Sequence, residues 1–172
     1  MFKSKWNIVL VLAACALLLP ATVSAKKPVE RPLKIQSDAT VVGTSDFSSI
    51  VVTETGEATH LGRFSSLGNA TVSYYDPDTG EYTLHYFTDW TAANGDVLKL
   101  EGFVDSATGP DPNKTYFTME FWCISGSTGR FVGATGGFGD GIEVYSGDSV
   151  YDPETETTTT TFSYRVTGTI TY

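Results

Sequence analysis

The chain is short of cysteine, and this limits both its covalent architecture and its chemistry. Its 172 residues contain two cysteines, Cys15 and Cys123. Cys15 lies in an apolar N-terminal run, which leaves Cys123 as the only thiol in the remainder, too few for an internal disulfide. A nucleophilic cysteine needs a nearby base, and the sequence offers only His60 and His85. We therefore expect Cys123 to be a small buried hydrophobic residue.

Basic residues are also scarce. Beyond residue 25 there are nine Lys and Arg residues against all 20 acidic residues, which gives a net charge of −11. Four of the nine bases lie within residues 26–34, so the rest of the chain is more acidic still. Nucleic acid and anionic membrane surfaces both attract positive charge. The composition argues against nucleic acid as a partner and against a membrane-bound mature form.

The sequence lacks the motifs of metal and cofactor sites. His60 and His85 are isolated, without the spacing of zinc ligands. Residues 76–81 (DPDTGE) open like a calcium loop, but the twelfth position, where an EF-hand has its last ligand, is Phe87. A hairpin turn built from Asp, Pro and Gly explains this stretch better. We expect neither a metal nor a cofactor.

What the chain does have begins with a secretory signal. Residues 1–7 carry two lysines, residues 8–20 are apolar, and residues 23–25 (VSA) form a small-residue cleavage site. We predict a signal peptide over residues 1–25, one domain over residues 26–172, and a secreted or periplasmic protein. The alternative is a lipoprotein anchored at Cys15. The residues after Cys15 stay apolar, whereas a mature lipoprotein turns polar there.

Alternation of apolar and polar residues dominates the rest of the chain and predicts half-buried strands. One such strand places on a single face Tyr82, Leu84, Tyr86 and Trp90. The expected strands cover residues 33–43, 47–55, 58–65, 69–76, 81–93, 96–105, 115–125 and 157–172, with another near 141–147. No ten-residue segment shows a helical stripe. Many short strands at regular spacing predict an all-β sandwich or barrel.

Residues 126–137 (GSTGRFVGATGG) are unusually rich in glycine. A phosphate loop would end in Gly-Lys-Ser/Thr, and a dinucleotide loop would join a strand to a helix. This stretch has no lysine, and no amphipathic helix follows it. We expect a structural corner, where glycines permit a positive φ or a close approach of the backbone.

The same stretch resembles the G-G-[ST]-G-x-F-x-x-A-x-G segment of plant dirigent proteins and allene oxide cyclases. In both families it follows a long apolar strand, as residues 115–124 (TYFTMEFWCI) precede it here. Residues 58–64 (ATHLGRF) resemble a stretch of uncharacterised bacterial secreted proteins of that barrel class. The resemblance implies a single eight-stranded antiparallel β-barrel, trimeric in the plant families, with a structural corner at Gly126, Gly129, Phe131, Gly133 and Gly136. It carries no catalytic residue across, because the matched positions are structural.

A barrel of this size can hold one small ligand, and the chain contains 10 Phe, 9 Tyr and 3 Trp residues. The candidates for lining such a pocket are Tyr86, Trp90, Phe121 and Glu120. For Glu120, an acid in an apolar strand, three interpretations are open: it faces solvent, pairs with a base such as Arg130, or lies in a cavity with a raised pKa.

Three functions remain open at this point. The first is binding of a small apolar or aromatic molecule, the second is a cofactor-independent cyclase or isomerase of the allene oxide cyclase type, and the third is a structural or oligomeric surface protein. A lined pocket with a buried ionisable group would favour the enzyme. Residues 115–125 are apolar on both faces, so one set of large side chains must lie outside a barrel, either Phe117, Met119 and Phe121 or Tyr116, Trp122 and Ile124. We therefore also expect self-association.

Overall fold

The computed structural model describes residues 27–107, 109–111, 114–139 and 145–172. These residues form nine strands and one short 3-10 helix, with the bounds β1 (Glu30–Thr44), β2 (Ile50–Ala58), β3 (Gly62–Tyr75), β4 (Tyr82–Ala92), β5 (Val97–Ala107), β6 (Lys114–Cys123), η1 (Gly129–Phe131), β7 (Thr135–Phe138), β8 (Tyr145–Asp152) and β9 (Thr157–Thr171). The predicted signal peptide over residues 1–25, including Cys15, lies outside the described residues.

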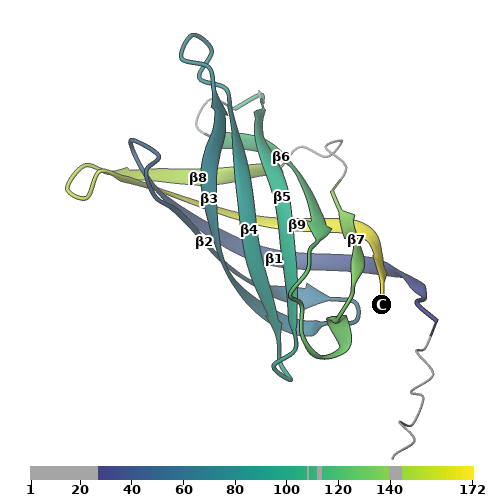
Figure 1. Cartoon of the computed structure of the whole chain (residues 1–172). Helices are drawn as coiled ribbons and strands as arrows, with labels where there is room; N and C mark the ends of the chain where they lie inside the picture. The colour runs from purple at the N-terminus through teal and green to yellow at the C-terminus, as the bar shows by residue number, and fades with distance from the viewer. Residues whose placement is uncertain (1–26, 108, 112–113, 140–144) are drawn as a thin grey trace, which may run out of the picture.

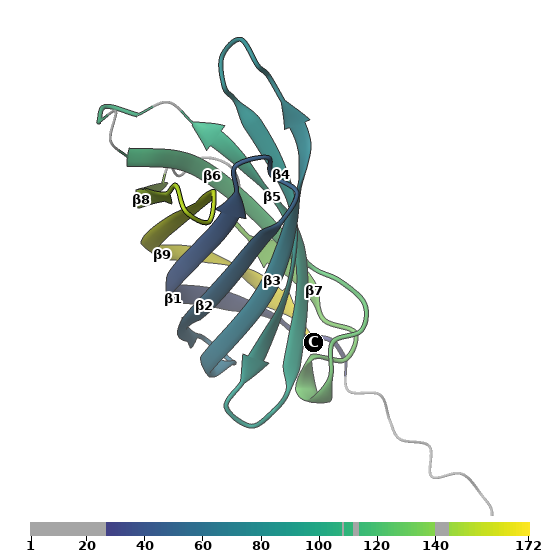
Figure 2. The same ribbon diagram turned by 90° about the vertical axis from the view of Figure 1, so that its left-hand side faces the viewer.

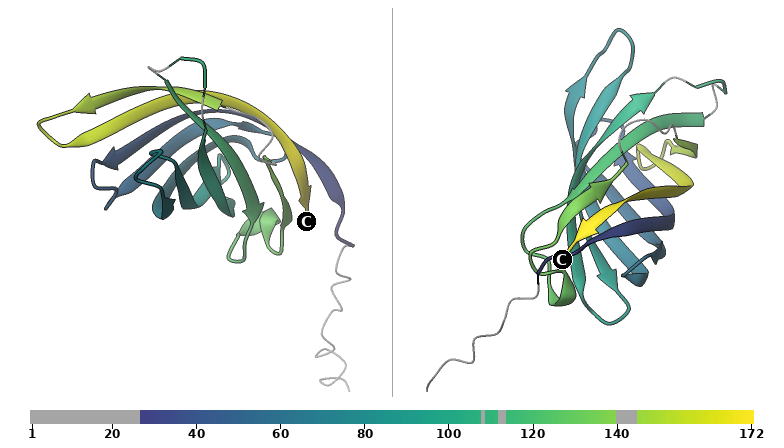
Figure 3. Two further views of the ribbon diagram at one scale, coloured as in Figure 1. Left: turned by 90° about the horizontal axis from the view of Figure 1, so that it is seen from above. Right: turned by 90° about the vertical axis from the view of Figure 1, so that its right-hand side faces the viewer.

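Eight antiparallel strands close into a β-barrel, which confirms the fold class expected from the sequence. Each of β1 to β6 pairs with the next, β7 joins β6 to β9, and β9 pairs with β1 to complete the ring. Figures 1 and 2 show the long strands from two sides, and Figure 3 shows the sheet curling round until β9 lies beside β1.

The strand β8 is a ninth strand, in addition to the eight that form this ring. It pairs with β6 through Phe117 and Tyr145 and with β9 through Thr161 and Asp148. The four-residue strand β7 also pairs with both β6 and β9, further along each of them. Two short strands thus lie one after the other between the same two long strands.

Several strand boundaries differ from the sequence expectation, and the short strand β7 was not among the expected strands. The expected strands 58–65 and 69–76 are one continuous strand, β3, and Gly68 lies within it, paired with Val52 and Thr88. The expected strand 47–55 is displaced to β2, because residues 45–49 form a turn in which Asp46 accepts the Ser48 N–H at 3.0 Å. The strand expected near 141–147 begins at Tyr145 among the described residues and continues to residue 152.

One end of the barrel is closed by tightly packed apolar side chains. The β2–β3 and β4–β5 turns and η1 lie together at this end, the lower one in Figure 1. The side chains packed there are fully buried, namely Leu33, Leu98, Leu100, Phe131 and Ile170. Burying each such side chain contributes roughly 1.5–3 kcal/mol. This layer forms a solid floor below the remaining interior.

The glycine-rich segment completes that floor. After β6 ends, the chain continues along the edge of β5, where Thr128 Oγ1 accepts the Val97 N–H at 2.9 Å and Ser127 Oγ accepts the Lys99 N–H at 3.0 Å. At this edge of β5, side-chain hydroxyls therefore accept the hydrogen bonds that the backbone carbonyls of a neighbouring strand would otherwise accept. The short helix η1 then turns Phe131 into the interior.

The glycines of this segment have the backbone conformation that L side chains rarely adopt. Gly126, Gly129, Gly133 and Gly136 all have positive φ, at 96°, 56°, 76° and 102°. At Gly136 the backbone also lies against the Thr169 carbonyl of β9, so a Cβ there would collide with it. The segment is a bend in the barrel wall.

Candidate functional site

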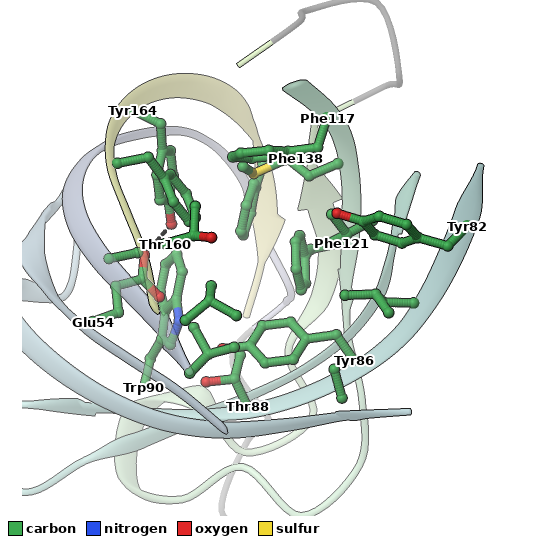
Figure 4. A pocket seen from close by; sticks show the side chains of 18 residues that line it. Glu54, Tyr82, Tyr86, Thr88, Trp90, Phe117, Phe121, Phe138, Thr160 and Tyr164 are labelled. Atoms are coloured by element: carbon green, nitrogen blue, oxygen red, sulfur yellow. Dashed lines mark hydrogen bonds between the residues drawn. The ribbon is translucent and has the colours of Figure 1, made fainter. Parts of the chain in front are cut away.

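Above the floor, the barrel encloses a cavity of about 90 Å³. Figure 4 shows its side chains, which come from strands on every side of the barrel. The mouth is lined by half-buried residues, namely Val41, Tyr82, Leu84, Val104, Thr160 and Phe162. The cavity therefore has a closed inner end and an outer end near solvent.

Aromatic rings make up much of the cavity wall. Phe138 stacks on Trp90 and on Phe121, with ring centroids 5.2 Å apart in each pair. Tyr86 meets Phe121 edge to face at 5.2 Å. Trp90 also stacks on Phe64 of the floor at 4.3 Å, which places it at the inner end. Such contacts hold the rings in fixed orientations.

Two glycines within strands make room for these rings. A Cβ at Gly68 would collide with the ring of Tyr86, and a Cβ at Gly102 would collide with the ring of Phe121. Because neither glycine has a side chain, each ring lies flat across the neighbouring strand. Glycine inside a strand often marks a close approach of this kind.

A buried acid, Glu54 of β2, lies in the cavity wall and is 5% exposed. Tyr164 Oη donates a hydrogen bond to Glu54 Oε1, and Ser66 Oγ donates one to Oε2 at 3.1 Å. Burial raises the pKa of the Glu54 carboxyl above its ordinary value, and these hydrogen bonds oppose the rise only in part. Burial and the nearby Glu54 also raise the pKa of the Tyr164 hydroxyl.

Three further polar atoms in the wall have no hydrogen-bond partner among the described residues. They are Tyr86 Oη, Thr88 Oγ1 and Trp90 Nε1, all on inward-facing side chains of β4. The Trp90 indole lies near enough to Glu54 to lower its pKa, yet its N–H makes no hydrogen bond of good geometry. Buried polar groups are nearly always paired, so three unpaired ones side by side require an explanation.

Three of the four residues proposed from the sequence as pocket residues line this cavity: Tyr86, Trp90 and Phe121. Glu120 does not, because it is exposed on the outer face of β6. Of the three interpretations of Glu120, the first, that it faces solvent, therefore describes its position. On β6 the inward set is Phe117, Met119 and Phe121, which leaves Tyr116, Trp122 and Ile124 half-buried on the outside.

The buried acid that sequence reasoning missed is Glu54. A signal was present, because Ile50, Val52 and Glu54 share one parity and the first two are apolar. The threonines on either side of Glu54 made the stretch look like an ordinary polar surface.

The remaining chemistry-bearing side chains lie away from the cavity. His85 is on the outer face, where its Nε2 lies 2.7 Å from Glu101 Oε1 and its ring stacks on Phe103 at 4.9 Å. Cys123 is half-buried, and burial raises the pKa of its thiol to about 11. Across the described ranges, no group of three or more His, Cys, Asp or Glu side chains is placed to hold a metal ion.

Comparison with protein-family models, with curated proteins and with solved structures found no match for this chain. The resemblance to allene oxide cyclases and dirigent proteins therefore remains a prediction from the sequence. In the part of the chain that the structure describes, no helix has the length and apolar character needed to cross a membrane.

Proposed function

We propose that this protein is a secreted β-barrel that binds a small, largely apolar or aromatic molecule in the cavity above its floor. The observation that carries the proposal is the row of three buried, unpaired polar atoms on Tyr86, Thr88 and Trp90, set in an aromatic wall. A wall that is apolar except for a few convergent polar groups is typical of a ligand site. A molecule that fills the space and pairs those atoms would account for both features.

The size of the cavity limits the ligand. An engineered cavity of about 150 Å³ binds benzene, and the space here is about 90 Å³ with an open mouth. A single ring would therefore fill the enclosed space, and any short substituent would extend into the mouth near Tyr82 and Leu84. A long acyl chain would have to extend into solvent.

The direct test is native mass spectrometry of protein purified from its own host. We expect a retained ligand, seen as a discrete mass added to the mature chain and lost on denaturation. The matched variants are Ala70→Leu, which adds three carbon atoms inside the cavity, and Thr71→Leu, which adds a leucine on the outer face of the same strand. Ala70→Leu should lose the added mass and Thr71→Leu should keep it. If the wild-type protein and Thr71→Leu never carry a small molecule and bind none offered to them, the proposal fails.

A second candidate is a cofactor-independent isomerase or cyclase, and the position of Glu54 favours it. A buried carboxyl holds its proton more readily than an exposed one, because burial raises its pKa, and it can give that proton to a bound molecule. In an isomerisation the same group takes a proton back, so no other reactant is needed. Protein carrying Glu54→Gln should then still bind the molecule recovered from the wild type but no longer convert it. Unchanged conversion by Glu54→Gln would exclude this candidate.

A further inference from the structure

The inner end of the cavity contains a hydrogen-bond donor, the Trp90 indole N–H, with no acceptor well placed to pair with it. The indole N–H of Trp90 can only donate, and the hydroxyls of Tyr86 and Thr88 each carry a hydrogen to donate. None of the three makes a hydrogen bond of good geometry within the described residues, although the Tyr86 hydroxyl lies near Thr88 and Ser66. All three side chains are at least nine-tenths buried.

Glu54 lies near the Trp90 indole, but the Trp90 N–H makes no hydrogen bond of good geometry with it. The carboxyl oxygens of Glu54 accept instead from Tyr164 and from Ser66. If the carboxyl is protonated, as its burial favours, it adds a further O–H donor to the same region. What the Trp90 N–H lacks is therefore an oxygen placed to accept from it.

The positions of Tyr86, Thr88 and Trp90 along β4 give the depth of each side chain in the cavity. Successive inward side chains on a strand are about 7 Å apart, and Trp90 is the one that contacts the floor, where it stacks on Phe64. The rings of Phe121 and Phe138 lie alongside, with their centroids 5.2 Å apart. A ligand entering from the mouth would thus place its leading atom near Trp90 and Glu54 and its ring against these aromatic side chains (Figure 4).

Charge narrows the choice of acceptor. A carboxylate ligand would offer lone pairs, but it would bring a second acid beside Glu54 into a buried site of a protein with a formal net charge of −9. An amine brings more donors and so leaves the existing ones unpaired. A carbonyl oxygen accepts two hydrogen bonds, donates none and carries no charge.

We propose that the cavity takes small neutral carbonyl compounds, single-ring ketones or aldehydes, whose oxygen accepts from Trp90 Nε1 and a neighbouring hydroxyl. This inference rests on the proposed binding function and specifies its ligand class.

The test compares three molecules of similar size: acetophenone, isopropylbenzene, in which a methyl group replaces the oxygen, and benzoate. Calorimetric titration of the mature protein should show acetophenone binding roughly tenfold more tightly than isopropylbenzene, the effect of about one satisfied hydrogen bond. Benzoate should bind more weakly than either. In ¹⁵N-resolved NMR, acetophenone should move the indole N–H signal of Trp90 downfield and leave that of Trp122, on the outer face, unchanged.

The matched variants are Trp90→Phe and Trp122→Phe. The preference for acetophenone over isopropylbenzene should fall towards one in Trp90→Phe and persist in Trp122→Phe. Should Trp90→Phe not fold, the NMR shift in the wild type decides the matter alone. Equal binding of acetophenone and isopropylbenzene, or an unmoved Trp90 signal, would overturn the carbonyl class and leave the binding function standing. Tighter binding of benzoate would overturn the requirement for a neutral ligand, and binding of none of the three would count against both proposals.

Discussion

Glu54 is an acid held in an environment very different from water. It lies between Tyr164 and Ser66 inside a largely apolar barrel. Its neutral form is favoured by burial, whereas the unfolded chain exposes it to water, where its pKa is near 4.5. The difference between the two states links this one carboxyl to the stability of the whole domain.

The sign of that linkage gives a testable prediction. Because the folded-state pKa is raised, the folded protein holds more protons than the unfolded chain above pH 4.5, and this contribution to the free energy of unfolding falls as pH rises to the folded-state pKa. Glu54→Gln removes this dependence. Urea unfolding at pH values from 4 to 8 should show the variant gaining stability relative to the wild type as pH rises. Parallel pH profiles for the two proteins would contradict the prediction.

At the scale of the element, the corner after β6 combines strained backbone with close packing. Gly133 and Gly136 both have positive φ, but only Gly136 lies against another strand, at the Thr169 carbonyl. At Gly133 a Cβ would meet open space. Substitutions at Gly133 and Gly136 therefore separate the effect of an unfavourable φ from the effect of a collision with β9.

We expect Gly136→Val to lower the free energy of unfolding by more than ~1 kcal/mol, and by more than Gly133→Val does. Both variants must adopt an unfavourable φ, and only Gly136→Val must also displace β9. Gly129→Val should also lower the free energy of unfolding, because Gly129 has a positive φ, but by less than Gly136→Val, because the Asp96 carboxylate in its way ends a side chain that can move. Thermal or urea unfolding measures all three. Wild-type stability for both Gly129→Val and Gly136→Val would rule out the corner interpretation.

The alternation of apolar and polar residues made much of the fold predictable. It fails where a strand is apolar on both faces, because the sequence then does not say which face points inward. On β4 and β9 one face is apolar and the other polar, so the sequence defines the inward set, including Tyr86, Trp90 and Tyr164. On β6 both faces are apolar, so only the closure of the barrel decides that Phe121 points inward and Glu120 outward. The sequence predicted a break between strands near Gly68. The reason for a glycine inside the strand, the Tyr86 ring that lies against it, is 18 residues away and leaves no local signal.

At the scale of the whole molecule, the outer face of β4 to β6 carries aromatic rings among its charged side chains. It carries a connected set of rings, which we call the outer aromatic strip: His85, Phe87, Phe103 and Trp122. Phe87 is 45% exposed, and Leu67 on the adjacent strand is 62% exposed. A contiguous apolar patch of this kind usually marks an interface.

We therefore expect the mature protein to self-associate at micromolar concentration through the outer aromatic strip; a trimer is expected only from the family resemblance. Sedimentation should show an oligomer, and dilution should change the fluorescence of Trp122. Phe87→Lys should weaken the association, because it places a charge in the contact. The control is Val150→Lys on β8, another exposed apolar residue away from the strip. A clean wild-type monomer whose fluorescence does not change on dilution would exclude this interface.

The barrel wall is held by few backbone pairs between β6 and β7, a part of the wall that we call the seam. Only Gly137 and Phe138 of β7 pair with β6, whereas β1 pairs with β9 along the whole of Glu30–Thr44. Local opening follows the region with the fewest hydrogen bonds to break, so backbone amides along β7 should exchange with solvent before those of β1. Phe138 belongs both to this seam and to the cavity wall. A transient parting of the seam would therefore open the cavity sideways, giving a ligand a second way in besides the mouth.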